Sequence, residues 1–314
     1  MCLFLCVLCV LCGVMKIAHL SDPHLTSLDP VRWRELLNKR ILGYLSWRLR
    51  RRRAHSREIL SRTLAHLAGQ QPDHLVISGD LTHLGAASEC REAETWLNRI
   101  GAPDYISIVP GNHDRYIAAD LEQTLGRWRA YMQSDPGAAA RGPQFPYLRV
   151  RGPVALIGLS SAVPTPPFYA SGRLGEEQLQ HLGHLLEATA QQGLYRIVIL
   201  HHSPHSISSR RGLSDAGALL STLAGPGAEL VIHGHGHRQM QATLQAGARR
   251  IPVFGVPSAS ASYNDPAKAP GYYIYEISQL PSGWQTRVNS FILNEETQEF
   301  EQALMPLAAT TTRR

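Results

Sequence analysis

The body of this chain has almost no cysteine: of its five cysteines, four lie at positions 2, 6, 9 and 12, and only Cys90 follows them. A disulfide within the body is therefore excluded, as is a thiolate zinc site, and we expect a cytoplasmic protein. The 314 residues also show no internal repeat and no linker long enough to divide them. With 44% hydrophobic and 18% charged residues, the composition excludes a disordered chain.

The longest apolar run, residues 1–14, is too short to span a membrane comfortably. It also lacks the positive charge that begins a signal peptide and the small residues that mark a cleavage site. We interpret it as an apolar leader ahead of a true start at Met15, with a hydrophobic anchor as the alternative. Residues 15–306 then form one domain, and residues 307–314 form a short tail.

Positive charge is concentrated in one segment. The chain has a net charge of +6, but residues 31–58 alone hold ten Lys or Arg against two Glu, so the rest of the chain carries −2. Within residues 31–53, apolar side chains recur at roughly helical spacing between the arginines. This pattern predicts a basic amphipathic helix inserted into the domain.

The insertion has three interpretations. Trp33, Arg40, Tyr44 and Trp47 are typical of a helix that contacts lipid or an anionic membrane surface, which would place the protein peripherally at the inner face of a membrane. A solvated helix that packs its apolar stripe on the domain is the plainer alternative. A nucleic-acid contact is the least favoured, because aromatic platforms for nucleic acid usually lie on sheets.

From Met15 onward, short apolar runs alternate with stretches of helical periodicity, which predicts a layered α/β domain. The expected strands are residues 16–21, 74–78, 105–109, 154–160, 196–200 and 229–233, with further β-rich runs at 251–256, 272–277 and 284–293. The expected helices are residues 57–68, 86–100, 118–131, 176–191 and 215–223.

Five of the expected strands are each followed by Asp, His or Asn. These motifs are Asp22-Pro23-His24, Gly79-Asp80, Gly111-Asn112-His113-Asp114, His201-His202 and His233-Gly234-His235-Gly236-His237, and they hold seven of the fifteen histidines. Sheets of α/β domains usually carry their active sites at the carboxyl ends of the strands. One such motif is uninformative by itself, whereas five in order predict a common site.

The donor types indicate divalent metals. Carboxylates, imidazoles and an amide carbonyl suit manganese or iron, with zinc as the alternative. The spacing Asp22-x-His24 lets two side chains converge on one ion, and Asp80 is placed to bridge two ions with one carboxylate. Glycines beside these residues permit tight turns and close backbone approach.

The ordered set resembles the calcineurin-like metallophosphoesterase superfamily, whose pattern is D-x-H, G-D, G-N-H-[DE], H and G-H-x-H. The resemblance implies an α/β fold, a four-layer αββα sandwich of two mixed β-sheets flanked by helices. It implies one metal bound by Asp22, His24, Asp80 and His237, and a second bound by Asp80, Asn112, His201 and His235. His201 is preferred to His202 because it directly follows the strand.

The same resemblance implies roles for the neighbouring residues. A hydroxide bridging the two metals would attack phosphorus, and His113 would stabilise the transition state or protonate the leaving oxygen. Asp114 would orient the imidazole of His113, with hydrogen bonding to nearby backbone amides as its alternative role. His202 and His233 would contact substrate or support the metal ligands.

We therefore expect a dinuclear metallophosphoesterase that cleaves a phosphodiester or pyrophosphate bond in a nucleotide-containing substrate. The G-N-H-D form resembles the cyclic-nucleotide phosphodiesterase branch. Residues 38–45 are similar to a basic segment of UDP-2,3-diacylglucosamine pyrophosphatases of lipid A synthesis, which is the alternative function. A nuclease and a non-catalytic metal-binding scaffold are further alternatives, and the oligomeric state stays open.

Overall fold

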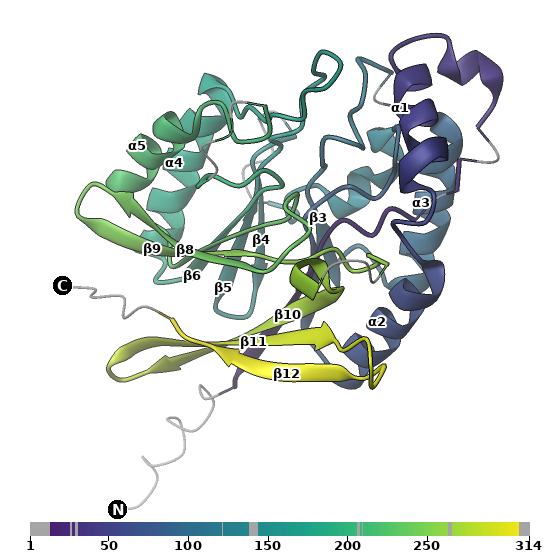
Figure 1. The fold of residues 1–314 in the computed structure, drawn as a ribbon. Helices are drawn as coiled ribbons and strands as arrows, with labels where there is room; N and C mark the ends of the chain where they lie inside the picture. The colour runs from purple at the N-terminus through teal and green to yellow at the C-terminus, as the bar shows by residue number, and fades with distance from the viewer. Residues whose placement is uncertain are drawn as a thin grey trace, which may run out of the picture.

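The computed structural model describes residues 13–307 except residues 26, 29, 30, 121, 138–143, 206, 207, 209 and 263–265. Two six-stranded mixed sheets pack face to face, with helices on their outer faces (Figure 1). This is the four-layer sandwich expected from the sequence. Residues 1–12 of the expected leader and 308–314 of the expected tail lie outside the described residues. Among the helices described, none has the length and apolar character needed to cross a membrane.

The first sheet has the order β12-β11-β10-β1-β2-β3. Its strands are β1 (Met15–Leu20), β2 (His74–Ile77), β3 (Ile106–Ile108), β10 (Gly271–Leu280), β11 (Gly283–Leu293) and β12 (Phe300–Met305). Strands β1, β2 and β3 run parallel, so their carboxyl ends meet at one edge, while β10 pairs antiparallel with β1.

The second sheet has the order β4-β5-β6-β7-β9-β8. Its strands are β4 (Tyr147–Arg151), β5 (Val154–Gly158), β6 (Tyr195–Ile199), β7 (Leu230–His233), β8 (Met240–Ala246) and β9 (Arg249–Gly255). The four central strands, β5, β6, β7 and β9, are parallel, and the two outer strands are antiparallel to their neighbours.

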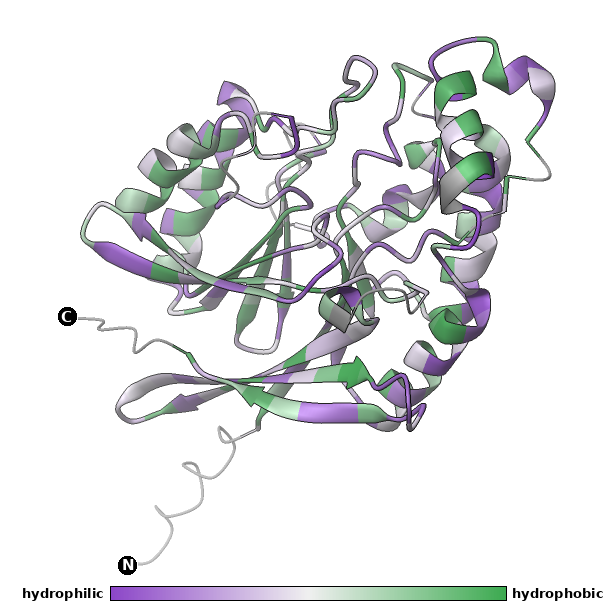
Figure 2. Cartoon of the chain, in the orientation of Figure 1, coloured by the Kyte–Doolittle hydropathy of each residue, from purple (hydrophilic) through white to green (hydrophobic). Residues whose placement is uncertain are grey.

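Alternating side chains of the second sheet build two cores. Leu156 and Ile197 point into the core between the sheets, whereas Ile157 and Val198 point to the outer face. That outer face is covered by α4 (Glu176–Gln191) and α5 (Ala216–Ala224), while α2 (Arg57–Gly69) and α3 (Ala87–Ile100) cover the first sheet (Figure 1). The buried strands are mostly hydrophobic in Figure 2. Both sheets are therefore fixed from two sides, which gives their strand ends a rigid support.

The sequence pattern missed three strands and overstated one helix. Strands β4, β8 and β12 lie at sheet edges, where alternation with exposed polar residues weakens the apolar signal. Residues 118–131 were expected to form one helix, but the structure has only a 3₁₀ helix at Leu125–Tyr131. The 3₁₀ segment still buries Leu125, Trp128 and Tyr131, which explains why its spacing resembles that of an α-helix.

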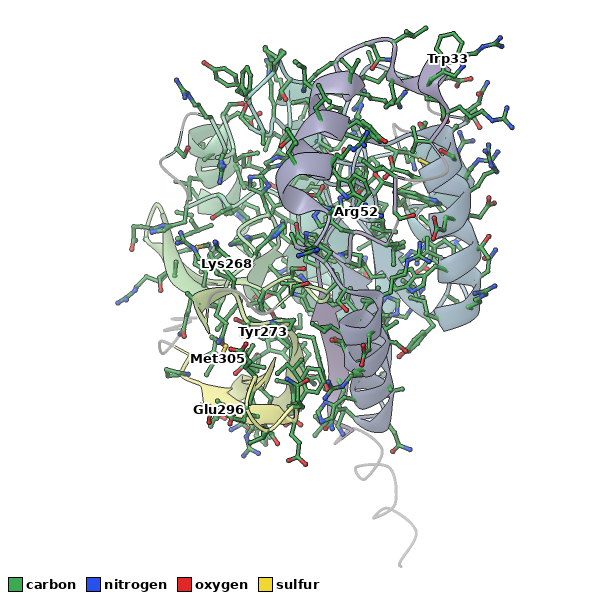
Figure 3. The ribbon with its side chains drawn as sticks, turned by 45° about the vertical axis from the view of Figure 1, so that its right-hand side comes forward. Trp33, Arg52, Lys268, Tyr273, Glu296 and Met305 are labelled. Atoms are coloured by element: carbon green, nitrogen blue, oxygen red, sulfur yellow. The ribbon has the colours of Figure 1, made fainter. Side chains whose placement is uncertain are left out.

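The basic insertion is three short pieces rather than one helix. It consists of a 3₁₀ turn at Trp33–Leu36, α1 (Arg40–Ser46) and a π-helical turn at Trp47–Arg51. Because residues 37–39 separate the 3₁₀ turn from α1, and the π-helical turn widens the helix after Ser46, the inward and outward residues differ from those of one regular α-helix. Figure 3 shows Trp33 at the outer end of the insertion, far from Arg52 near its other end.

Two of the four expected lipid contacts are wrong. Arg40 is only 7% exposed, and its guanidinium donates to the carbonyl oxygens of Leu84 and Gly85. Trp47 is 5% exposed and packs against Leu84. Both side chains attach the insertion to the domain. Burying the Trp47 ring and pairing the Arg40 guanidinium with two carbonyl oxygens are more favourable than exposing these groups at the surface.

Candidate metal centre

The five motifs lie together at the carboxyl ends of β1, β2, β3, β6 and β7. Five of their residues adopt positive φ angles: Asp22 (51°), His24 (40°), Asp80 (56°), His235 (64°) and His237 (49°). Only three other described non-glycine residues do so. Left-handed backbone is costly for such residues and concentrates at functional sites, where the surrounding structure holds it in place.

Two glycines make room for Asp80. A Cβ added to Gly79 would lie 2.5 Å from the backbone nitrogen of Gly111, and one added to Gly111 would overlap the Asp80 carboxylate. The backbone segments that follow β2 and β3 are therefore in direct contact, and only glycine permits this close approach. Their contact holds the Asp80 carboxylate in the centre of the site.

The first group of donors is Asp22, His24, Asp80 and His237, whose ligand atoms all lie within 4.8 Å of one another. His237 Nε2 is 3.0 Å from Asp22 Oδ1, and His24 Nε2 is 3.9 Å from Asp80 Oδ2. Three of the four are fully buried and His237 is partly exposed, so the group is open on one side. These are the four residues expected around one ion.

The second group surrounds His201 Nε2. This nitrogen lies 3.3 Å from Asp80 Oδ2, 3.2 Å from Asn112 Oδ1 and 3.2 Å from His235 Nδ1. Because His201 Nδ1 contacts the carbonyl oxygen of Ser78 at 2.6 Å, it carries the proton of the neutral ring, and Nε2 presents a lone pair. The geometry thus brings together the four donors expected around the second ion.

The residues fit divalent cations, because lone pairs and negative charge converge on both positions. Burial by itself lowers the pKa of His201, but the carboxylates of Asp80 and Asp22 outweigh it and raise that pKa to about 9. The pKa values of Asp22 and Asp80 are lowered, although burial alone would raise them, because nearby imidazoles favour the carboxylates. The centre therefore attracts positive charge.

His113 lies against Asp80 at the edge of the site. Its backbone N–H donates to Asp80 Oδ1 at 2.8 Å, and its Nδ1 contacts the carbonyl oxygen of His83 at 2.5 Å. The ring lies edge-on to His24, with centroids 5.1 Å apart. The carbonyl of His83 therefore holds the ring of His113 at Nδ1.

The expected role of Asp114 is wrong. Its two carboxylate oxygens accept from the backbone N–H groups of Asp80, Thr82 and Gly111 and from the Thr82 hydroxyl, at 2.8–3.0 Å. Burial first, and then the Asp80 carboxylate, raise the pKa of Asp114 to about 7. Asp114 therefore holds together the backbone segments that follow β2 and β3, which is the hydrogen-bonding role named above as its alternative.

His202 and His233 are buried beside the second group. His202 Nδ1 contacts Ser161 Oγ at 2.8 Å, and its ring belongs to a cluster with His201 and His235. His233 Nδ1 contacts the carbonyl oxygen of Gly234 at 2.9 Å. In the described part of the chain, Nε2 of each ring is buried without a hydrogen-bond partner.

His55 and His83 also lie at the site, although the sequence motifs do not include them. The ring centroid of His55 lies 4.3 Å from that of His24, and the ring centroid of His83 lies 4.9 Å from it. His83 is three residues after Asp80, so its distance from the Gly-Asp motif was a usable signal. His55 follows the insertion rather than a strand, and nothing in the local pattern distinguishes it.

We predict that Asp114→Asn lowers the free energy of unfolding by about 1–3 kcal/mol, because an amide oxygen cannot accept from all four donors and its NH₂ group would face two of them. Chemical denaturation of the metal-free protein measures this. A variant of unchanged stability with reduced turnover would restore the orienting role toward His113.

The family model for calcineurin-like phosphoesterases matches residues 15–239. A probable cyclic nucleotide phosphodiesterase of Synechococcus sp. (strain ATCC 27144) is 26% identical over 70% of this chain and 73% of its own length. Another, of Pseudoalteromonas sp. (strain SM9913), is 22% identical over 79% of this chain and 80% of its own.

Solved structures share the fold. A dimetal phosphatase from Danio rerio superposes with a TM-score of 0.61 at 14% identity, covering 93% of this chain and 98% of that one. A purple acid phosphatase from yellow lupin seeds gives 0.59 at 11% identity, covering 93% and 53%. Since the family model spans more than half of the chain and the donors form two groups around one carboxylate, the chain belongs to the calcineurin-like phosphoesterase family, as a dinuclear metallophosphoesterase.

Proposed function

We propose that this enzyme hydrolyses a nucleotide-type phosphodiester, with cyclic nucleotides as the first substrate class. The observation that carries the proposal is the convergence of two donor groups on the buried Asp80 carboxylate, with His113 bonded to that carboxylate through its backbone. The substrate class is supported by two sequence relatives, which are both named probable cyclic nucleotide phosphodiesterases.

In this proposal, Asp22, His24, Asp80 and His237 hold one ion, and Asp80, Asn112, His201 and His235 hold the other. Manganese or iron suits this mixture of carboxylate, amide and imidazole, and zinc is the alternative. When bound, two such ions activate water and neutralise charge on the phosphoryl oxygens.

His113 is the residue proposed to move a proton. The His83 carbonyl accepts from Nδ1–H, so the proton exchanged with substrate is carried at Nε2. Protonated there, the ring can deliver a proton to the leaving oxygen, which a diester requires because an alkoxide is a poor leaving group. The Asp80 contact to the His113 backbone fixes the distance between this ring and the metal centre.

A cavity of about 560 Å³ is the proposed site for the nucleoside part of the substrate. Arg115 and Arg173 line it, one following the Gly111–Asp114 motif and the other following Gly172, which packs against the His202 ring. Ala162, next to the Ser161 that contacts His202, lines it as well. The cavity thus lies near the second donor group, and its lining combines three arginines with three glutamates, which offers both hydrogen-bond donors and acceptors to a polar ligand.

Hydrolysis of cyclic AMP, bis-p-nitrophenyl phosphate, UDP-2,3-diacylglucosamine, DNA and RNA by the manganese-loaded protein tests the substrate class. We expect cyclic AMP and bis-p-nitrophenyl phosphate to be cleaved and UDP-2,3-diacylglucosamine to be cleaved more slowly. Preference for the lipid nucleotide would support the second candidate below, and cleavage of DNA or RNA would indicate a nuclease. Metal-loaded protein that cleaves none of them would indicate a scaffold.

Two substitutions separate metal binding from proton transfer. Asp80→Ala is expected to abolish both bound metal and activity, because one carboxylate serves both donor groups. His113→Ala is expected to retain two ions per chain and lose about 10²–10⁴-fold in turnover, as for other acid–base residues. Metal analysis and kcat measure both. Full turnover in His113→Ala would remove His113 from the mechanism.

The second candidate is a lipid-linked nucleotide as substrate, with the insertion docked on an anionic membrane surface. One observation favours it: the insertion exposes Trp33 (66%), Leu37 (70%) and Leu49 (79%), and also Ile41, Leu42 and Leu45. Arginines 32, 34, 48, 52 and 53 are exposed around them. Large apolar side chains gathered with arginines match the requirements of an interfacial segment.

We predict that the protein cosediments with vesicles containing phosphatidylglycerol and not with pure phosphatidylcholine vesicles. The double variant Leu37→Ser/Leu49→Ser should bind about tenfold or more weakly, because burying one leucine contributes about 1.5–3 kcal/mol. Leu304→Ser is the matched control, since Leu304 is 67% exposed on β12, outside the insertion. Equal binding by the double variant and the wild type would exclude this surface.

A further inference from the structure

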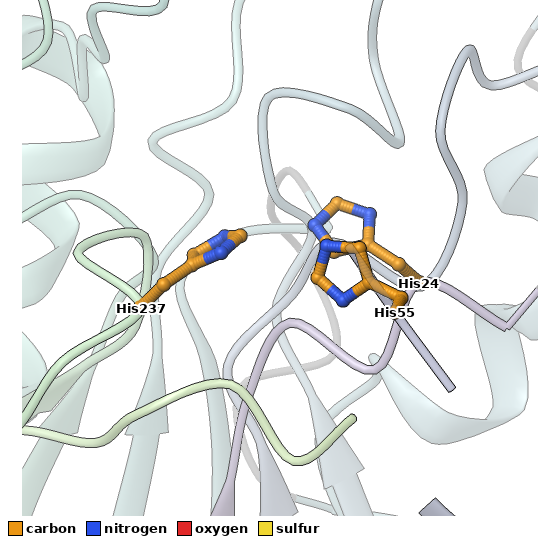
Figure 4. Close-up of side chains that lie close together, drawn as sticks. All are labelled: His24, His55 and His237. Atoms are coloured by element: carbon orange, nitrogen blue, oxygen red, sulfur yellow. The ribbon is translucent and has the colours of Figure 1, made fainter. Parts of the chain in front are cut away.

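His55 joins the metal centre from the far end of the basic insertion. Its ring centroid lies 4.3 Å from that of His24 and 5.6 Å from that of His237. One ring nitrogen of each histidine lies within 4.8 Å of the others, and Figure 4 shows the three rings turned toward one another. Neither the strand-end motifs nor the two proposed donor groups contain this residue.

The backbone of His55 is fixed by the loop that also supports Asp22. His55 forms an isolated antiparallel bridge with Ala261, and the N–H of Ser56 donates to the carbonyl oxygen of Ser260 at 2.8 Å. In the same loop, Ser258 Oγ donates to the carbonyl oxygen of Asp22 at 2.7 Å. The position of His55 relative to Asp22 is therefore set by the fold and not by a surface loop.

The contacts of Ser260 favour Nε2 of His55 as the nitrogen that can bind an ion. Its hydroxyl lies 3.4 Å from the Asp22 carbonyl oxygen, where it donates, and 2.8 Å from His55 Nδ1, from which it accepts. The neutral ring then carries its proton on Nδ1 and its lone pair on Nε2. His24 and His201 show the same pattern, with Nδ1 against the carbonyl oxygens of Thr82 and Ser78. Metal-binding histidines are commonly held in this way.

We propose that His55 is a third imidazole ligand of the ion assigned above to Asp22, His24, Asp80 and His237. The inference rests on that assignment. Two nitrogens that each lie about 2.1 Å from one ion are at most about 4.2 Å apart. The ring nitrogens of His24, His55 and His237 lie within 4.8 Å of one another, so a small inward shift of the rings would let all three bind one ion.

The added ligand changes the character of the site. With His55, the set that would hold this ion has five protein donors, three of them imidazoles, and would leave less room for water or substrate. A nitrogen-rich set also binds iron or zinc better than an oxygen-rich set does. Because His55 follows the insertion directly, this ligand would join the end of the insertion to the metal centre.

A matched pair of variants tests the proposal. His55→Asn keeps an amide near the Nδ1 position, within reach of Ser260, and removes the donor at Nε2. His55→Gln places an amide oxygen near the Nε2 position instead. His184→Ala is the control, because His184 is exposed on α4. The metal-free proteins are titrated with Co²⁺ and followed by calorimetry and by visible absorption.

We expect the wild type and His184→Ala to bind two ions alike. His55→Asn should weaken one of them at least about tenfold and change its absorption band, while the other ion is unaffected. His55→Gln should recover part of the lost affinity. If His55→Asn bound both ions with wild-type affinities and gave the wild-type spectrum, the proposal would be overturned. A change in KM or in thermal stability would not alter that conclusion. A wild type that binds no ion would instead refute the metal assignment itself.

Discussion

The buried carboxylate of Asp80 is the constraint on which the rest of the site depends. It lies with a second buried carboxylate, that of Asp22, in an interior where uncompensated charge is strongly unfavourable. Backbone N–H groups of His113 and His235 each stabilise one of the carboxylates, and His201 and His237 face them. The imidazoles outweigh the cost of burial, so the pKa values of both carboxylates are lowered, and divalent cations would stabilise the pair further.

Holding such a site requires a rigid support, which explains the size of the two cores. Five site residues have left-handed backbone, and two chain ends cross at Gly79 and Gly111 with no room for a side chain. Each feature costs free energy that the strands must recover elsewhere. The parallel strands beneath the site are buried on both faces, so the strand ends cannot relax to relieve the strain without exposing apolar surface.

The sequence predicted the strands that carry the motifs because those strands are short, apolar and followed by polar residues. The meeting of Asp22 with His201 and His237 was implied only by the family resemblance, because these residues follow strands of two different sheets and strand patterns do not show how two sheets pack. The role of Asp114 could not be read, because its partners are backbone amides, which every residue has. His55 was missed because Ser260, which orients it, is 205 residues away in sequence.

The insertion shows a different limit of sequence patterns. Helical spacing of apolar residues shows that some face is buried, but not where a helix breaks. The breaks at residues 37–39 and 47 turn Arg40 and Trp47 inward and leave Trp33 and Leu49 outside. The ring centroids of Trp47 and His83 lie 6.2 Å apart, and the backbone carbonyl oxygen of His83 contacts the ring of His113. The buried side of the insertion thus packs against His83, the residue whose carbonyl oxygen holds the proposed proton-transfer residue His113.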